Sequence, residues 1–527
     1  MVIANMVSNN FILNNNLSLA IYNQFMKKLF TIVFLASGLA TFAQTPKKDP
    51  ATVLISPQQT LSKKDTDFRK AIAKWSDEVL KSTNYKNVKA QPSSAIFPGA
   101  VKPGYQLISQ TVSIQHKKIA DSLVGIVSTL GYSGYDHDIM YSTGLYAVAG
   151  QYIEIDVPKN TNTDDLEAQI GAHTDRLNEW VAGTEDWRRM PIITKTQKLV
   201  VGVNRLASPF GGLIYINLNP KSQSRKIDLK ISHAVTAPLF VLGKTSPSDW
   251  GNQLKNNKAP WGEMATENVI LTLPDSVLQT IKNPQEVMKL WDLIIEGEMD
   301  LAQMPLPFYR AQRLVPDEHI GGGYMHSGYP IMIHHSPTKH MLSNEIMANP
   351  ELLMKPSGGG ANWGFFHEIG HNMQNLNWVF GGTTEVSNNF FSLYMFDRLM
   401  GGRDNAHTAI SNANTQKQMK KYFAEGANYE KWKNDPFLGL IMFRQMQEGF
   451  GWESFKAFFR EYQKIGPNIG DLNDQQKRDL WVKTYSNIVK RNLAPFWNTW
   501  GVTISDNVNK ELSVYPQWMP YNFPPQN

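Results

Sequence analysis

One short segment constrains the fold of this chain more than any other. His367, Glu368 and His371 form an H-E-x-x-H pattern, and Glu385 follows after a pair of glycines. Residues four apart share one face of a helix, with Cβ atoms about 5–6 Å apart, so both imidazoles can reach one ion. A turn at the glycines would fold a second helix back and bring Glu385 opposite the histidines. The segment therefore predicts an antiparallel helix pair that holds a metal ion.

The residue types indicate which metal and which chemistry. Two histidines and one carboxylate, with a fourth position open, are typical of a catalytic zinc site. Glu368 follows the first histidine, so it can contact the water that zinc activates without binding the metal itself. The chain has no cysteine, which excludes thiolate ligands, thiol nucleophiles and disulfides. We predict one Zn²⁺ held by His367, His371 and Glu385, with Glu368 as general base; two unrelated histidines on a surface helix are the alternative.

Three nearby side chains are candidates for supporting roles. Asn389 lies four residues after Glu385 and shares its face, so it is predicted to orient a ligand imidazole by a hydrogen bond. Asn388 is the neighbouring candidate, and plain helix-surface amides are the other interpretation. Trp378 lies between the second histidine and Glu385. It would either stack against a sugar ring or substrate side chain, or pack under the connecting loop.

A zinc site that activates water for attack on a carbonyl group also needs a donor for the developing oxyanion, and His, Tyr and Arg serve this purpose. The candidates are Tyr329, His326 and Arg444, among which the spacing does not choose. Five of the twelve histidines fall within residues 319–340. They predict either the polar lining of a cleft or a second metal site. These histidines are His319, His326, His334, His335 and His340.

The hydrophobic pattern predicts an α+β fold with several parts. Residues 106–245 contain short β-branched runs separated by Gly, Pro and Asn, which predicts a sheet-rich, sandwich-like unit. Within it, residues 166–181 are predicted to form one surface helix. Helical periodicity predominates afterwards, which predicts a mainly helical catalytic zinc subdomain at 246–400 and a helical C-terminal subdomain at 401–527. Residues 44–105 are expected to form a helix and a linker.

The N-terminal part predicts export. Lys27-Lys28, a run of about a dozen apolar residues and a small-residue site ending at Ala43 have the features of a signal peptide over residues 26–43. An Asn-rich extension, residues 1–25, precedes it. The run is too short to span a bilayer. We therefore expect a periplasmic, cell-surface or secreted protein without a membrane span after signal removal.

The charge distribution gives no sign of a nucleic-acid partner. The formal net charge is +6 over 527 residues. No block of Lys and Arg is dense enough to predict a nucleic-acid groove.

The segments around the metal motif resemble peptidase family M60, the enhancin-like and mucin-degrading metallopeptidases. The resemblance lies in residues 364–374 and 382–389, and similar segments extend it over about 140–520. They are residues 143–146, 208–215, 323–330 and 492–496, with Trp500-Gly501. The resemblance implies a gluzincin catalytic unit with the same three ligands and Glu368 as acid and base. It also implies that an edge strand ahead of the zinc helix pairs with the substrate backbone, for which residues 329–333 are the candidate.

The predicted function is that of a secreted zinc metalloendopeptidase. The resemblance implies that its substrates are O-glycosylated, mucin-like glycoproteins. Two alternatives stay open at this point. One is a general zinc endopeptidase without a glycan requirement, and the other is a non-catalytic M60-like module that binds glycans or proteins.

Overall fold

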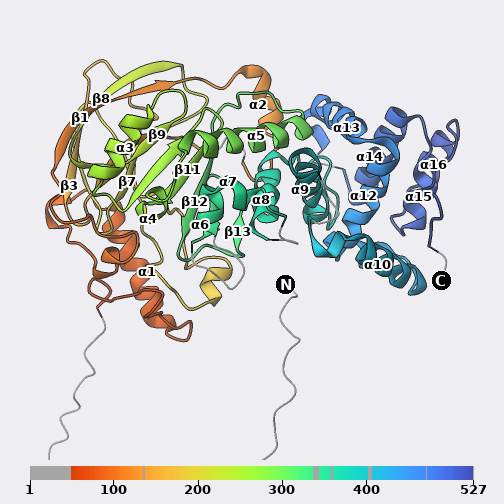
Figure 1. Cartoon of the computed structure of the whole chain (residues 1–527), viewed down its shortest axis with the longest axis horizontal. Coiled ribbons are helices and arrows are strands. Elements are labelled where there is room, and N and C mark those ends of the chain that lie inside the picture. The colour runs from red at the N-terminus through yellow and green to blue at the C-terminus, as the bar shows by residue number, and fades with distance from the viewer. Residues whose placement is uncertain are drawn as a thin grey trace, which may run out of the picture. The chain divides into compact units, whose positions relative to one another are not determined.

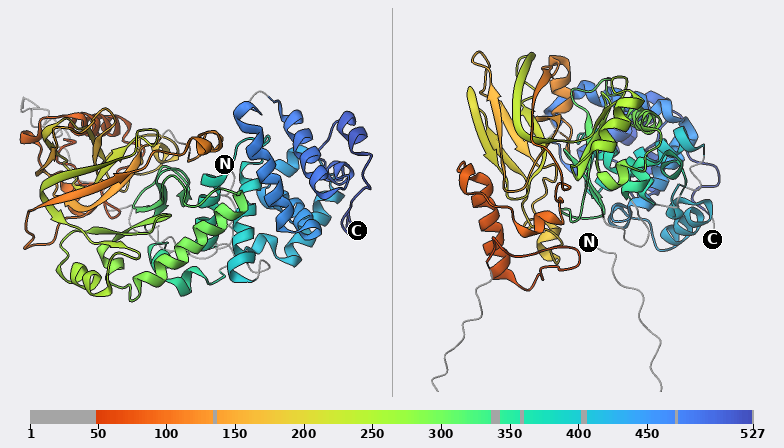
Figure 2. Two further views of the ribbon diagram at one scale, coloured as in Figure 1. Left: turned by 90° about the horizontal axis from the view of Figure 1, so that it is seen from above. Right: turned by 60° about the vertical axis from the view of Figure 1, so that its left-hand side comes forward.

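The computed structural model of the chain describes residues 49–133, 137–335, 343–356, 360–401, 406–469 and 472–525 (Figure 1). The expected signal peptide and the extension before it lie outside these residues. Strands predominate up to His334, and the described chain beyond it is mostly helical, which Figure 2 shows from two further sides. The predicted α+β class is therefore confirmed. Within the described ranges, no helix has the length and apolarity needed to cross a membrane.

The first sheet has eight strands and forms the predicted sheet-rich unit. These strands are β1 (Ile108–His116), β2 (Ile139–Ala147), β3 (Tyr152–Val157), β4 (Glu167–Ile170), β5 (Lys195–Lys198), β6 (Gly202–Ala207), β7 (Gly212–Leu218) and β8 (Arg225–Thr236). Their order is β5-β4-β7-β2-β8-β3-β6, and β1 also pairs with β8. The long strand β8 pairs with β1 along most of its length, with β3 over Lys230–Ser232 and with β2 near its end. One face of the sheet encloses an apolar core to which alternate residues such as Ile227, Leu229 and Ile231 contribute.

The helix predicted over residues 166–181 is wrong. The first part of this segment is β4, which pairs with β5 on one side and β7 on the other. Its apolar residues Leu166, Ala168 and Ile170 alternate with polar ones and belong to the strand core. Over so few residues, the same apolar positions fit a strand period as well as a helix period.

A second, six-stranded sheet follows, and the sequence analysis missed most of it. Its strands are β9 (Leu239–Val241), β10 (Trp261–Ala265), β11 (Val269–Pro274), β12 (Gln312–Asp317), β13 (Met325–His326) and β14 (Ile331–His334). Their order is β13-β14-β12-β11-β10-β9, with both parallel and antiparallel pairs. All residues of β10 and β12 are buried. Strands that are covered on both faces lack the alternating pattern by which half-exposed strands are recognised, so these were not predicted.

The two sheets pack face to face through a shared core. Met140, Tyr146 and Tyr215 of the first sheet belong to the same cluster as Trp261 and Met332 of the second. A buried ion pair between Arg313 and Glu263 lies in this interface. The Tyr215 hydroxyl donates a hydrogen bond of 3.0 Å to the Glu263 carboxylate. Arg313 also donates a hydrogen bond of 2.9 Å to the carbonyl of Met140.

Helices cover the second sheet and build the rest of the chain. The first is α1 (Thr66–Lys81), within the predicted N-terminal helix. The others up to the metal motif are α2 (Asp121–Val127), α3 (Pro247–Asn256), α4 (Asp275–Leu278), α5 (Pro284–Ala302), α6 (Ser343–Ala348), α7 (Pro350–Leu353), α8 (Ala361–Met373) and α9 (Thr384–Met400). The Asn283 side chain caps α5 by accepting a hydrogen bond from the Glu286 amide. This long helix packs against both α8 and α9.

The helical C-terminal portion is present as predicted. Its helices are α10 (Asn412–Ala424), α11 (Tyr429–Lys433), α12 (Pro436–Phe450), α13 (Trp452–Ile465), α14 (Asp474–Val489), α15 (Ala494–Thr499) and α16 (Asp506–Leu512). Aromatic side chains dominate the packing between them. Phe458 and Trp481, for example, join α13 to α14 with ring centroids 4.2 Å apart. Helix α12 also packs against α9, so it supports the helix pair that carries the metal motif.

Candidate metal site

Helices α8 and α9 lie side by side and bring three predicted ligands together (Figure 1). His367 and His371 lie on α8, and Glu385 lies in the first turn of α9. The Oε2 atom of Glu385 is 2.9 Å from Nε2 of His367 and 3.5 Å from Nε2 of His371. Ligand atoms around a tetrahedral zinc with bonds of about 2.1 Å are separated by about 3.4 Å. The three side chains therefore fit one tetrahedral metal ion.

No second group of this kind occurs in the part of the chain that the structure describes. Three histidines of the possible second site pair with separate carboxylates, and His334 stacks on His319 with ring centroids 6.4 Å apart. The pairs are His319 with Glu185 at 3.2 Å, His335 with Glu318 at 3.7 Å and His326 with Asp175 at 2.8 Å. His340 lies outside the described residues.

The neighbouring histidines keep Glu385 in the ionised form that can bind a metal. Burial acts to raise the pKa of this carboxyl, but hydrogen bonds and the charges of His367 and His371 outweigh it and hold the pKa far below its usual range. Burial acts to lower the pKa of His367, and the hydrogen bond with Glu385 and the charge of Glu368 outweigh that effect and raise it. Glu385 is therefore ionised at any physiological pH, as a metal ligand must be.

Each ligand histidine has an amide partner on its other ring nitrogen. The Oδ1 of Asn389 lies 2.9 Å from Nδ1 of His367, where the sequence analysis expected an orienting residue. The Oε1 of Gln374 lies 3.2 Å from Nδ1 of His371. The Gln374 amide in turn donates to the Thr384 carbonyl at 2.9 Å and to the Ser387 hydroxyl at 2.7 Å. Both rings are thus arranged to present Nε2 to a metal.

Gln374 is a site residue that the sequence analysis missed. It directly follows α8 and lies three residues after His371. Residues three apart are neighbours on a helix surface, so the spacing from His371 to Gln374 could have indicated this contact from the sequence.

The close approach of α8 and α9 depends on a glycine inside the metal motif. A Cβ atom on Gly370 would lie 2.6 Å from Oδ1 of Asn388 and 2.7 Å from Cβ of Phe391. The Nδ2 of Asn388 donates a hydrogen bond of 2.6 Å to the backbone carbonyl of His367. Asn388 therefore fastens the backbone of the two helices together, whereas Asn389 contacts the ligand ring itself.

His326 lies on β13, at the edge of the second sheet and in contact with α8. Its Nδ1 is 2.9 Å from the Ser327 carbonyl, and its Nε2 is 2.8 Å from the Asp175 carboxylate. Burial acts to lower the pKa of His326, but Asp175, the Ser327 carbonyl and the charge of Glu368 together raise it. This oxyanion candidate is therefore within electrostatic reach of Glu368, but both of its ring nitrogens are already engaged by acceptors.

The predicted edge strand has to be corrected. Strand β14 covers Ile331–His334 and pairs with β12 on one side and β13 on the other. It has no free edge for a substrate. The free edge next to α8 belongs to β13, which was too short to be recognised from the sequence.

Two other oxyanion candidates lie elsewhere. The Tyr329 hydroxyl accepts a hydrogen bond of 3.1 Å from the Met140 amide in the first sheet. Arg444 lies on α12, and its guanidinium donates 2.8 Å and 2.7 Å hydrogen bonds to Glu448 and the Ile410 carbonyl. The contacts that the structure gives for these two side chains are therefore structural, and none of them reaches the metal ligands.

Trp378 packs in the core below the α8–α9 connection. It is 2% exposed, and its ring centroid is 4.2 Å from that of Phe459 and 6.5 Å from that of Phe391. Of the two roles weighed for this residue, the structure supports packing, because a side chain buried to this extent offers no face to a substrate.

Tyr132 lies at the metal site although no motif marks it in the sequence. Its ring centroid is 4.8 Å from that of His371, and 38% of the residue is exposed. Leu130, two residues before Tyr132, forms a β-bridge with Asn375, and the Ser133 hydroxyl donates a 2.6 Å hydrogen bond to the Asn372 carbonyl. Burial raises the pKa of Tyr132, and the charges of Glu385 and Glu368 raise it further.

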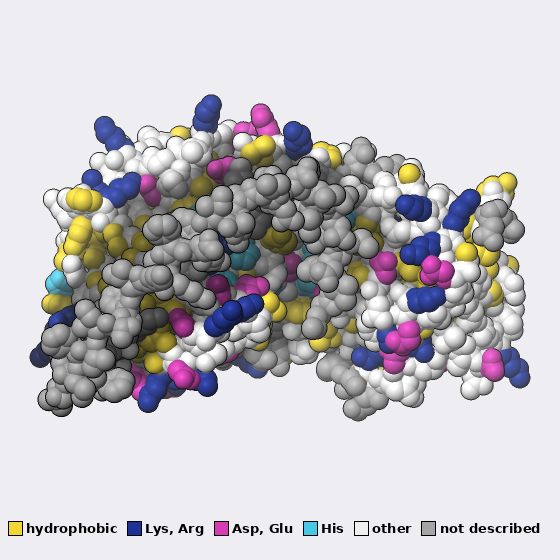
Figure 3. Space-filling view, turned by 90° about the horizontal axis from the view of Figure 1, so that it is seen from below, with side chains coloured by type: hydrophobic (Ala, Val, Ile, Leu, Met, Phe, Trp, Pro, Cys, Tyr) yellow, Lys and Arg dark blue, Asp and Glu magenta, His cyan; other side chains and the backbone are white. Residues whose placement is uncertain are grey.

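Trp180 is an exposed aromatic side chain beside His326. It is 74% exposed, and its ring centroid lies 5.8 Å from that of His326. Its backbone has a φ of 51°, a left-handed conformation that is strained for a bulky residue. Figure 3 shows histidine and acidic side chains near one another in the middle of one face of the molecule. Among the residues described around His326, Trp180 offers the most exposed ring.

Comparison with known proteins identifies the family. The sequence profile described as "Peptidase M60, enhancin and enhancin-like" matches residues 233–501. The profile of the "N-terminal domain of M60-like peptidases" matches residues 129–232. The chain belongs to peptidase family M60. The predicted family resemblance is thereby confirmed, and M60 membership implies a metal cofactor.

Curated relatives carry a different name. Human TRPM8 channel-associated factor 2 is 36% identical over 394 residues, which are 74% of this chain and 40% of that protein. The mouse TRPM8 channel-associated factor 2 is 36% identical over 385 residues, again 40% of its length. This M60 chain thus spans about 40% of the length of these relatives.

Solved structures share the fold. A functionally unknown conserved protein from Bacillus anthracis superposes with a TM-score of 0.61 at 22% identity, covering 78% of this chain and 80% of that one. The ZmpB metallopeptidase from Clostridium perfringens gives 0.57 at 17% identity, over 77% and 82% of the two chains. The M60 catalytic domain of ZmpC from the same organism, solved in complex with the sialyl T antigen, gives 0.55 at 17%, over 78% and 80%. The fold is that of M60 catalytic domains.

Proposed function

We propose that this M60 chain is a zinc metallopeptidase that hydrolyses peptide bonds. One observation carries the proposal: His367 and His371 of α8 and Glu385 of α9 meet at the distances of a tetrahedral site, with Glu368 on the same helix. Zinc held there would supply Lewis acidity that polarises a scissile carbonyl and acidifies a water molecule.

The chain's own residues would carry out the proton transfers. Glu368 is half-buried next to His367, so its carboxylate can take a proton from the attacking water. It then delivers this proton to the leaving amine nitrogen. Asn389 and Gln374 keep the two imidazoles oriented during the reaction. Tyr132 flanks the site, and we assign to its hydroxyl the hydrogen bond that stabilises the oxyanion. Both ring nitrogens of His326 are already engaged by the Ser327 carbonyl and the Asp175 carboxylate, so this histidine is not assigned that role.

We further propose that the substrates are O-glycosylated proteins. Two supports exist. Solved structures with this fold include the M60 domain in complex with the sialyl T antigen and a metallopeptidase in complex with the Tn antigen. In addition, the exposed indole of Trp180 beside His326 offers a flat apolar face, which is suited to the C–H face of a sugar ring.

A pair of matched peptides tests the proposal. One peptide carries an O-linked N-acetylgalactosamine on a single threonine, and its twin is identical but bare. We expect the zinc-loaded protein to cut only the glycosylated peptide, with the products identified by mass spectrometry. Equal cutting of both would leave a general endopeptidase and exclude the glycan requirement.

A non-catalytic role is the second candidate, and the curated relatives favour it. They are named for association with a channel, not for hydrolysis, at 34–36% identity among the human, mouse and bovine proteins. If the zinc-loaded protein bound the glycopeptide and cut neither peptide nor intact mucin, the binding role would replace the catalytic one.

Export through the segment at residues 26–43 is part of the same proposal. A glycoprotein substrate of this class is met outside the cytoplasm. N-terminal sequencing of the protein from its native host should find a mature chain that begins at Gln44, and an unprocessed chain would contradict export by this segment.

A further inference from the structure

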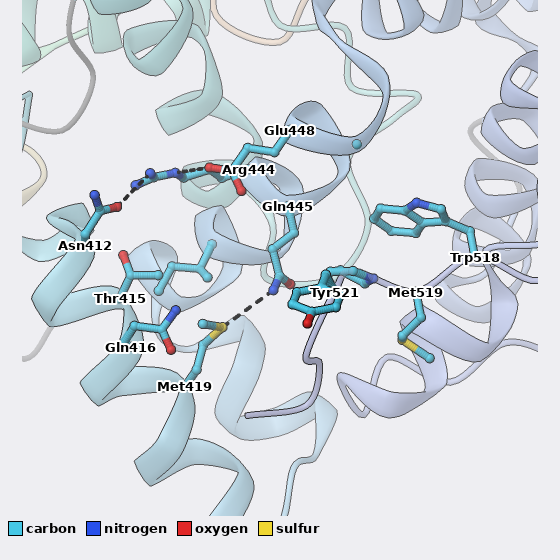
Figure 4. A pocket seen from close by; sticks show the side chains of 13 residues that line it. Asn412, Thr415, Gln416, Met419, Arg444, Gln445, Glu448, Trp518, Met519 and Tyr521 are labelled. Carbon is cyan, nitrogen blue, oxygen red and sulfur yellow. Dashed lines mark hydrogen bonds and ion pairs between the residues drawn. The ribbon is translucent and has the colours of Figure 1, made fainter. Parts of the chain in front are cut away.

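A pocket separate from the metal site lies in the helical C-terminal portion, between α10, α12 and residues 518–521 (Figure 4). Its volume is about 420 Å³, within the range of small-molecule binding sites. None of the metal ligands lines it. The side chains used in the argument below are Asn412, Thr415, Arg444, Gln445, Trp518 and Tyr521.

The aromatic wall of the pocket is held in place by specific contacts. The Trp518 backbone amide donates a 3.1 Å hydrogen bond to the Asn492 carbonyl. The Trp518 ring packs against Phe450 and Phe496, with centroid distances of 4.7 Å and 5.0 Å. A Cβ atom on Gly449 would lie 2.5 Å from the indole, so only glycine allows this approach. The wall is therefore rigid before any ligand arrives.

Tyr521 lies at the rim of the pocket and, unlike the packed Trp518, is exposed to solvent. It is 93% exposed, so its ring is almost wholly open to solvent. Figure 4 shows this ring on the same side of the pocket as Trp518 and Met519. A tyrosine in this position provides apolar surface and a hydroxyl for a ligand at little entropic cost.

Thr415 is a buried polar group that lacks a protein partner. It is 9% exposed, and its Oγ1 has no hydrogen-bond partner among the residues that the structure describes. Figure 4 shows the hydroxyl turned toward the end of the pocket where Asn412 and Arg444 lie. Buried hydroxyls in native proteins are almost always hydrogen-bonded, so this one indicates a missing partner.

Gln445 has a side-chain amide whose hydrogen-bonding capacity is only partly used by the protein. Its Oε1 accepts a 3.0 Å hydrogen bond from the Trp500 indole. The partner that the structure gives for its Nε2 is the Met419 sulfur at 3.7 Å (Figure 4). A thioether is a weak acceptor, so a ligand oxygen would compete with it successfully.

The charges of the pocket compensate each other. The Arg444 guanidinium donates a 2.8 Å hydrogen bond to the Glu448 carboxylate and a 2.7 Å hydrogen bond to the Ile410 carbonyl. This pairing favours a neutral ligand over an anion. A ligand that fits must offer a flat apolar face to the aromatic rings and several hydroxyl groups to the amides and the threonine.

We propose that this pocket binds a neutral saccharide residue, at a site separate from the metal centre. A pyranose ring presents C–H faces to Trp518 or Tyr521 and hydroxyl groups to Thr415 and Gln445. The inference does not depend on the proposed hydrolysis, because binding here requires neither the metal nor Glu368.

Binding of defined sugars to the full chain tests this. The Glu368→Ala variant is titrated with N-acetylgalactosamine, galactose, N-acetylglucosamine, glucose, sialic acid and a bare threonine-containing peptide, followed by calorimetry and ligand-observed NMR. We expect saturable binding of at least one neutral sugar with a dissociation constant on the order of 1 mM, typical of single-sugar contacts worth about 4 kcal/mol. Neither sialic acid nor the peptide should bind at this site.

Substitutions in the pocket identify the binding site. Thr415→Val keeps the shape and removes the unpartnered hydroxyl, so it should weaken sugar binding about fivefold or more without lowering the melting temperature. Tyr521→Ala should weaken it to a similar extent. Thr499→Val is the matched control, because that hydroxyl already donates a 2.8 Å hydrogen bond to the Pro495 carbonyl outside the pocket.

Three outcomes would overturn the proposal: no saturable binding of any neutral sugar, binding that is unchanged in both pocket variants, or binding of only the anion or the peptide. Loss of peptidase activity in Glu368→Ala does not affect the result. Failure of the saccharide site and failure of the proposed hydrolysis are therefore distinguishable.

Discussion

The Asn389 Oδ1 atom lies 2.9 Å from Nδ1 of His367, so a residue of α9 orients a ligand on α8. Loss of such a partner commonly lowers metal affinity 10- to 100-fold. We expect Asn389→Ala to weaken zinc binding by about this factor, measured by competition with a chromophoric chelator. Asn388→Ala is the matched control. It loses a bond to the His367 carbonyl instead, and should lower the melting temperature with a smaller effect on zinc affinity.

Replacement of Glu368 separates catalysis from metal binding. Glu368→Ala removes the proposed proton acceptor and leaves the three ligands unchanged, so turnover should fall by at least about 10²- to 10⁴-fold. Metal analysis should still find one zinc per chain. A variant that retained most of its activity would rule out Glu368 as the base, whereas loss of zinc would show that the residue supports the site structurally.

Tyr132→Phe tests the oxyanion assignment. The substitution keeps the ring that lies 4.8 Å from His371 and removes only the hydroxyl. If the hydroxyl donates to the oxyanion in the transition state, its loss should lower kcat by about 10²-fold and leave KM and zinc affinity nearly unchanged. If kcat stayed the same, the Tyr132 hydroxyl would not be the oxyanion donor.

Trp180→Ala tests the proposed sugar contact near the metal. The indole is 74% exposed, so its removal should leave the fold and the melting temperature unchanged. We expect KM for the glycosylated peptide to rise about tenfold, because stacking on a sugar is worth about 1 kcal/mol or more. Equal effects on the bare peptide, if it is cut at all, would argue against a sugar contact.

The buried Glu298 on α5 should make the stability of the folded chain depend on pH. The residue is fully buried, and neither carboxyl oxygen has a partner within the described ranges. Burial raises the pKa of Glu298 well above its ordinary value. The folded state therefore keeps a proton that the unfolded state releases above about pH 4.3.

The free energy of unfolding should consequently fall as the pH rises from about 4.3 toward the pKa of Glu298 in the folded state. The expected slope is about 1.4 kcal/mol per pH unit. Glu298→Gln has nearly the same shape and no charge, so it should lack this contribution and become increasingly more stable than the wild type between pH 5 and 7.5. Urea unfolding of both proteins at several pH values measures the difference. Parallel curves would mean that Glu298 is not neutral in the folded chain.

Much of the metal site could be predicted from the sequence because its main residues are close along the chain. The spacings from His367 to His371 and from Glu385 to Asn389 are helix spacings, and the intervening glycines indicated a turn. Tyr132 could not be found in this way. It reaches His371 from more than two hundred residues upstream through contacts with the end of α8, and a single sequence carries no signal for such a contact.

The errors in the fold have a similar physical origin. The buried strands β10 and β12 lack alternation, and β13 is only two residues long, so the second sheet was largely missed. Arg444 was an oxyanion candidate because a guanidinium group can donate to an anion. The sequence does not show that Glu448 and the Ile410 carbonyl already engage this group. Helix α9, whose residues follow a glycine turn and keep helix spacing from Glu385 to Asn389, was predicted correctly.

The shortness of β13 has a consequence for selectivity. An edge that consists of Met325 and His326 offers an extended peptide only about two main-chain hydrogen bonds. Such a peptide gains little affinity from its backbone, and its side chains or attached groups must supply the rest. We therefore expect this chain to spare ordinary unfolded polypeptides.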